Sequence, residues 1–74
     1  MDTQNPVTPE QREEWRWRLR MHERPFSVHI AAEELSRCGV LRQSLHRIAA
    51  AELRSLHREG VIEHVGGGWF RWIR

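Results

Sequence analysis

Residues 41–74 read LRQSLHRIAAAELRSLHRE, G, VIEHV, GGG and WFRWIR, and this stretch decides the fold. Its first part repeats apolar residues at the spacing of one helix face and ends at Gly60, a residue that favours a left-handed helix stop. Two alternating runs, 61–65 and 69–73, then flank three glycines, and this pattern predicts a β-hairpin. A helix that leads through a glycine directly into a tight hairpin is therefore the frame of the fold.

The chain has 74 residues, which suffices for one domain with a single small core. We expect that domain to cover residues 8–74 and to follow a flexible polar segment at residues 1–7. The sequence contains no apolar run of membrane-spanning length and no secretion leader, and Cys38 has no cysteine partner. These features predict a cytoplasmic protein without a disulfide.

A strong start signal predicts the first helix. Residues 8–11 read TPEQ, which combines a capping threonine, a proline in the first helical position and a glutamine where a capping box needs it. The alternation of apolar and basic residues in 15–21 would suit a strand, but the capping signal favours a helix. We therefore predict a helix from Pro9 to about Glu23.

The predicted first helix has two apolar faces. Trp15 and Leu19 share one face, which we expect in the core. Trp17 and Met21 fall on the opposite face, where the core does not need them. This second face is the candidate protein interface, and it predicts a homodimer joined through the first helix.

The middle of the chain predicts one strand and two helices. Phe26–Val28 is a short β-prone segment that can add a third strand to the hairpin. Ile30–Arg37 is a second short helix, and Gly39 marks the turn after it. The third helix begins near Leu41–Ser44 and runs to Glu59. The predicted fold class is therefore α+β, with three helices and a C-terminal hairpin.

The net charge of +2 hides an uneven distribution. Residues 1–14 carry four acids against one Arg, a local charge of −3, and residues 15–74 carry eleven Arg against six Glu, a local charge of +5. Between Arg37 and Arg58 there are five Arg and one Glu, which gives +4. A basic segment on the best helix is expected of a polyanion binder, although a solvated helix face has the same composition.

The third helix also has two faces. Leu45, Ala49, Leu53 and Leu56 cluster on the face that we expect in the core. The opposite face carries the side chains that major-groove recognition uses, because Arg pairs with guanine, Gln pairs with adenine and Ala allows close approach. The residues on this opposite face are Gln43, Arg47, Ala50, Ala51, Arg54 and Arg58.

Three motifs, AAEEL (31–35), LRSLHREGVIE (53–63) and GGGWFRWI (66–73), resemble the winged helix-turn-helix DNA-binding domains of small bacterial and phage regulators. The resemblance implies that the third helix enters the major groove and that the hairpin is a wing. It implies a double-stranded DNA partner and a regulator of transcription. The expected DNA contacts are Gln43, Arg47, Ala50 and Arg54 in the groove, and Arg42, Ser44, Arg58, Arg71 and Arg74 on the phosphate backbone.

Winged helices also serve as protein-docking modules. The alternative function is therefore a protein-interaction module, such as a phage-encoded antagonist of a host protein, that uses Trp17 and Met21. We expect no enzyme, no cofactor and no metal site. The five His lie on different elements without metal-ligand spacing, and the glycine run joins two strands instead of a strand and a helix.

Overall fold

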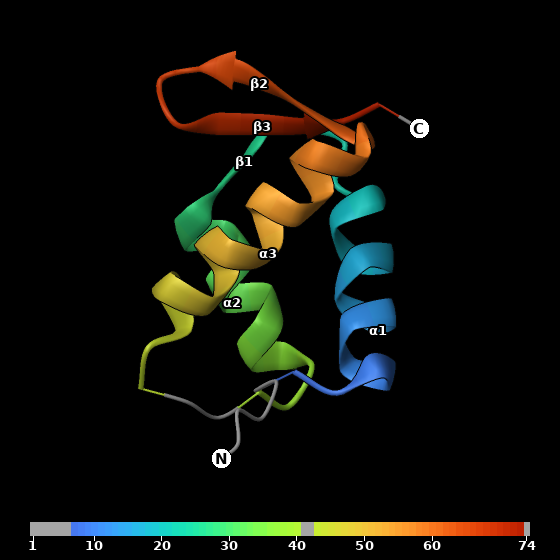
Figure 1. Ribbon diagram of the computed structural model, residues 1–74, viewed down its shortest axis with the longest axis vertical. Coiled ribbons are helices and arrows are strands. Elements are labelled where there is room, and N and C mark those ends of the chain that lie inside the picture. Colours follow the sequence, from blue (N-terminus) through green and yellow to red (C-terminus); the bar gives the residue numbers. More distant parts are fainter. Residues whose placement is uncertain (1–6, 41–42, 74) are drawn as a thin grey trace.

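The computed structural model describes residues 7–40 and 43–73, which form three helices and one antiparallel sheet (Figure 1). The predicted α+β class is thus confirmed. In chain order the elements are α1 (Pro9–Arg20), β1 (Phe26–Ser27), α2 (Val28–Arg37), α3 (Leu45–Glu59), β2 (Ile62–Gly66) and β3 (Trp69–Trp72).

The start of α1 has the predicted capping box. The Thr8 hydroxyl accepts the Gln11 backbone N–H at 3.1 Å, and the Gln11 side-chain oxygen accepts the Thr8 N–H at 3.1 Å. Val7, which we assigned to the flexible lead-in, is only 1% exposed and packs in the core. Val7 therefore belongs to the folded part, and residues 1–6 lie outside the described residues.

The end of α1 was predicted too late. The helix stops at Arg20 and not at Glu23. Its last turn tightens, because the backbone N–H of His22 bonds to the carbonyl of Leu19, three residues back, at 3.1 Å. The helix therefore ends before Pro25. A proline disfavours a helical conformation of the residue that precedes it.

The second helix starts earlier than predicted. It begins at Val28 instead of Ile30, because Ser27 is its N-cap and the Ser27 hydroxyl accepts the Ile30 N–H at 3.3 Å. Only Phe26 and Ser27 remain extended, and they form β1. The predicted third strand is confirmed, since β1 pairs with β3.

The third helix starts later than predicted and ends where predicted. Its first residue is Leu45, so Gln43 and Ser44 belong to the turn before the helix, with Ser44 as the N-cap. At the other end Gly60 has a φ of 80°, the left-handed conformation that glycine adopts without steric cost.

The sheet has the strand order β1-β3-β2, so the second strand of the hairpin lies in the centre. Phe26 faces Phe70 across β1 and β3, and Ile62 faces Trp72 across β2 and β3. The hairpin lies across the end of α3 from which it emerges, and the three helices lie together on one side of the sheet (Figure 1). The sheet thus closes one end of the helical core.

The hairpin turn is shorter than the predicted three-glycine loop. Gly66 pairs with Trp69, which leaves Gly67 and Gly68 as a two-residue turn with φ values of 59° and 80°. Positive φ at both central positions is what a tight type I′ hairpin turn requires. The strands stay aligned because the pairing shifts between His64 and Gly66, where a bulge absorbs the extra residue.

The core draws on all three helices and the sheet. The predicted core residues of α1 are confirmed, and the indole N–H of Trp15 also donates to the buried carbonyl of Ala31 on α2 at 2.9 Å. The outer face of α1 is exposed as predicted, at 61% for Trp17 and 58% for Met21. The largest fully buried side chains are Val7, Trp15, Leu19, Phe26, Leu35, Val40, Leu53, Leu56 and Ile62.

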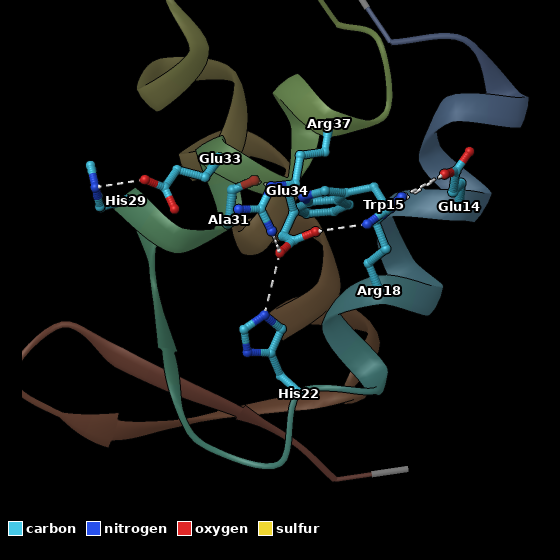
Figure 2. A network of polar contacts seen from close by, with 9 residues as sticks. All are labelled: Glu14, Trp15, Arg18, His22, His29, Ala31, Glu33, Glu34 and Arg37. Carbon is cyan, nitrogen blue, oxygen red and sulfur yellow. Dashed lines mark hydrogen bonds and ion pairs between the residues drawn. The ribbon is translucent and has the colours of Figure 1, made fainter.

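One carboxylate is buried between α1 and α2. Glu34 is 7% exposed and accepts hydrogen bonds from Arg18 and Arg37, each at 3.4 Å (Figure 2). His22 lies 3.5 Å from the same carboxylate. A buried carboxylate needs such partners to offset the loss of its hydration. Glu34 therefore ties α1, and the segment after it, to α2.

Candidate nucleic-acid interface

The acidic residues of α3 face α1. Glu52 accepts two hydrogen bonds from Arg12, both at 2.9 Å, and Glu59 accepts two from Arg16, at 2.9 and 3.3 Å. These fork-like pairs are the strong geometry for guanidinium and carboxylate. Hydrogen bonding to Glu52 also raises the pKa of the Arg12 guanidinium. These pairs neutralise Arg12 and Arg16 of α1 and both acids of α3.

The arginines of α3 face away from α1. Arg47, Arg54 and Arg58 are all exposed and form no hydrogen bond or ion pair with another described residue. Ala51 is exposed on the same face, four residues after Arg47. Arg54 and Arg58 are also four residues apart, so they repel by about 0.2–0.5 kcal/mol. An anion bound to this face would relieve that repulsion.

A groove of about 450 Å³ separates this face from the sheet. Its larger apolar lining residues are Leu53 of α3, which is buried, and Val28 of α2 and Phe70 of β3, which are half-buried. Ala50 also lines the groove and is half-buried. The small side chain that we expected among the exposed arginines therefore lies on the flank of α3, where it keeps the groove open.

Cationic and titratable side chains surround this apolar floor. Arg54, Arg58, His57 and His64 line the groove and are all exposed. An apolar floor with guanidinium groups at its edge suits a sugar–phosphate strand, in which a sugar face alternates with an anionic oxygen. The groove therefore extends the basic face of α3 toward the hairpin.

The predicted contacts at the start of α3 lie next to this face. Gln43 and Ser44 are exposed in the turn before the helix. Among the described residues, the Ser44 hydroxyl makes no capping hydrogen bond to α3. Arg42 lies outside the described residues.

The hairpin contributes less free positive charge than expected. Arg71 pairs with Glu63 on the neighbouring strand, with its Nε donating to a carboxylate oxygen at 2.8 Å. The Arg71 side chain is nevertheless 60% exposed, so an anion can share it. Trp69 is 43% exposed, and Arg74 lies outside the described residues.

A second surface carries the predicted protein-interface residues. Trp17 and Met21 are exposed on the outer face of α1. Trp17 also lines a hollow of about 180 Å³ together with Trp72, Arg16 and Arg20. The indole nitrogen of Trp72 is buried without a hydrogen-bond partner among the described residues. This surface thus places Trp17 next to Trp72 and two arginines.

Two features of the structure were not predicted. One is the buried carboxylate of Glu34, which the sequence shows only as half of an acidic pair. The other is a contact between His29 of α2 and His46 of α3, whose ring nitrogens lie 3.2 Å apart. No sequence pattern predicts this contact, because the two His are 17 residues apart on different helices.

Among residues 7–40 and 43–73, no group of three or more His, Cys, Asp or Glu side chains converges to hold a metal. The helices of the described part are all too short or too polar to cross a membrane.

Comparison of the chain with protein-family models, with curated proteins and with solved structures gave no match. Its function must therefore be inferred from the side chains that α1, α3 and the hairpin present.

Proposed function

We propose that this chain is a DNA-binding regulator with a winged helix-turn-helix fold, in which α3 enters the major groove and the β2–β3 hairpin is the wing. The order of the elements supports the fold. A helix pair, α2 and α3, is followed by a hairpin, and the short strand before α2 completes the sheet. The groove shared by Arg54 and Arg58 of α3 and by His64 and Phe70 of the hairpin supports the assignment of the hairpin as the wing.

The observation that carries the proposal is the separation of charge on α3. Its two acids are paired with arginines of α1, whereas Arg47, Arg54 and Arg58 have no acidic partner among the described residues. A face of one sign, exposed and backed by small residues, is what contact with a polyanion requires.

Each residue has a role in this proposal. Arg47 and Arg54 reach base edges, where a guanidinium forms two parallel hydrogen bonds with guanine. Arg58 contacts phosphate beside the groove, and Ser44 contacts phosphate at the start of α3. The remaining proposed contacts are Gln43 and Ala50 in the major groove and Arg42, Arg71 and Arg74 on the backbone.

The salt dependence of binding to duplex DNA tests the proposal. Each phosphate that is neutralised contributes about −0.9 to the slope of log binding constant against log salt, so three to five Arg predict a slope of about −3 to −5. Fluorescence anisotropy of a labelled duplex at several salt concentrations measures it. Arg58→Ala should reduce the steepness by about 1. No duplex binding at low salt, or a slope near zero, would rule the proposal out.

A second candidate function is a protein-interaction module. It is favoured by the outer face of α1, where Trp17 is 61% and Met21 is 58% exposed beside the hollow that contains Trp72. Exposed Trp and Met next to Arg are typical of binding hot spots. A homodimer would reconcile the two functions, since it places two reading helices on one DNA.

A further inference from the structure

His29 and His46 form a close pair at the seam between α2 and α3. Each is the second residue of its helix, and both are exposed. The Nδ1 atom of His29 lies 3.2 Å from the Nε2 atom of His46, and the ring centroids are 5.3 Å apart. Two ring nitrogens from different helices thus lie close together at the surface.

A third side chain fixes the orientation of one ring. Glu33, one turn further along α2, places a carboxylate oxygen 3.3 Å from Nε2 of His29 (Figure 2). A carboxylate at that distance accepts the Nε2 proton. In the neutral ring the lone pair then lies on Nδ1, which is the atom that faces His46. Carboxylate, histidine and a free imidazole lone pair in this order are the arrangement found behind metal-ligating histidines.

We propose that Nδ1 of His29 and Nε2 of His46 bind one divalent transition-metal ion of the zinc class. Two imidazoles on a tetrahedral zinc, with Zn–N bonds of about 2.0–2.1 Å, place their nitrogens about 3.3 Å apart. The observed separation of 3.2 Å fits that geometry. Imidazole ligands suit zinc, nickel and copper, whereas magnesium and calcium prefer oxygen ligands. Water would fill the other coordination positions, because no third ligand side chain converges among the described residues.

A hydrogen bond between the two rings is the competing account of the same distance. In that account His46 donates its Nε2 proton to His29, and the pair takes no metal. Metal binding instead requires His46 to carry its proton on Nδ1, so that both facing nitrogens offer lone pairs. The positive ends of α2 and α3 oppose a cation here, but this effect is screened by solvent and the Glu33 carboxylate counters it.

The metal site does not depend on the proposed DNA binding, since metal can bind to the chain without DNA. It would join the first turn of α2 to the first turn of α3, and it would stabilise the folded chain in proportion to metal occupancy. The test therefore uses metal binding to the full chain, with no DNA present.

Zn²⁺ titration by calorimetry, together with nitrogen chemical shifts of the imidazoles, tests the proposal. We expect one Zn²⁺ per chain, with shifts at Nδ1 of His29 and Nε2 of His46. His29→Gln and His46→Gln should each weaken binding at least tenfold, and Glu33→Gln should weaken it about 10–100-fold. His64→Gln is the matched control and should bind as the wild type does, since His64 is also exposed but lies on β2, where its ring packs against Phe70. Mg²⁺ should not bind.

Two results would overturn the metal site. One is the absence of Zn²⁺ binding by the wild-type chain at millimolar metal. The other is binding that is unchanged in His29→Gln or His46→Gln, which would place the ion elsewhere, for example at Cys38. Circular dichroism of each variant checks the fold, which substitutions at these exposed positions should leave intact.

Discussion

Burial raises the pKa of the Cys38 thiol above its ordinary value of 9.0. The nearby Glu14 carboxylate adds to this increase, because a negative neighbour disfavours the thiolate, while Arg18 opposes it. Cys38 is the C-cap of α2 and packs against the core. The folded chain thus favours the neutral thiol of Cys38 over the thiolate.

We predict that the free energy of unfolding falls at alkaline pH because of Cys38. A pKa raised by folding stabilises the native state fully below pH 9.0, and this contribution is lost as the pH rises through the folded pKa. The sequence contains neither Lys nor Tyr, so Cys38 is the only side chain that titrates between about pH 8 and 11. Urea unfolding of the reduced protein from neutral to alkaline pH measures the fall.

Cys38→Ala is the control for this prediction. Its unfolding free energy should stay level over the pH range in which that of the wild type declines. An equal decline in both proteins would assign the pH dependence to another group. The test compares how the unfolding free energy of each protein changes with pH. A loss of packing in the variant lowers its unfolding free energy at every pH and so does not affect this comparison.

At the scale of elements, α3 is divided lengthwise into three strips. One strip is buried, the second pairs its acids with α1, and the third presents Arg47, Arg54 and Arg58. If the third strip reads DNA, its members should differ in what they contribute. In the proposed function Arg47 and Arg54 reach base edges and Arg58 contacts phosphate, and both Arg54 and Arg58 line the groove.

We predict that Arg47→Ala and Arg54→Ala each cost about 1–3 kcal/mol of binding to the preferred DNA sequence and relax the sequence preference. Competition binding with selected and random duplexes measures both effects. Arg20→Ala is the matched control, since Arg20 is exposed on α1 and has no ion-pair partner among the described residues. An equal loss on every DNA sequence would make Arg47 and Arg54 phosphate contacts.

The sequence predicts elements well where the signal is local. The capping box at Thr8 and the left-handed stop at Gly60 depend on a few neighbouring residues, and both are confirmed. Element ends are less predictable. The start of α2 depends on the Ser27 hydroxyl, and the glycine turn loses one residue to a bulge beside Val65. Those details are set by pairing partners, which a local pattern does not specify.

Contacts between elements were the least predictable part of the candidate sites. The pairs Arg12–Glu52 and Arg16–Glu59 join residues about forty positions apart, and they decide which charges on α3 remain free. The His29–His46 contact depends in the same way on how α2 crosses α3. Sequence periodicity shows which residues share a face of a helix. It does not show which face of a neighbouring helix packs against them. The sequence predicted that Arg47, Arg54 and Arg58 share one face of α3. It did not predict that the acids of α3 pair with α1 and leave these arginines without an acidic partner among the described residues.

At the scale of the whole molecule, two surfaces of different character lie on different helices. The basic face belongs to α3, and the apolar face with Trp17 and Met21 belongs to α1. The ion pairs between α1 and α3 fix these helices against each other. A dimer formed through α1 would therefore hold its two basic faces at a defined spacing, as recognition of paired DNA half-sites requires.

We predict a weak homodimer with a dissociation constant of about 10–100 µM. A stable dimer usually buries about 800 Å² on each partner, and one Trp with one Met supplies only part of that area. Sedimentation over a concentration series should show reversible association of the wild type. Trp17→Glu and Met21→Glu should remain monomeric, because each places a charge in the contact.

Trp69→Glu distinguishes a specific dimer from non-specific association through exposed apolar side chains. Trp69 is 43% exposed, but it lies on the hairpin and not on α1, so this variant should associate as the wild type does. If Trp69→Glu also prevents association, the hairpin joins the contact and cannot at the same time flank DNA. The dimer is ruled out if the wild type stays monomeric at about millimolar concentration as well as after 100-fold dilution from it. In that case the exposed face of α1 would bind a different protein, which favours the second candidate function over the first.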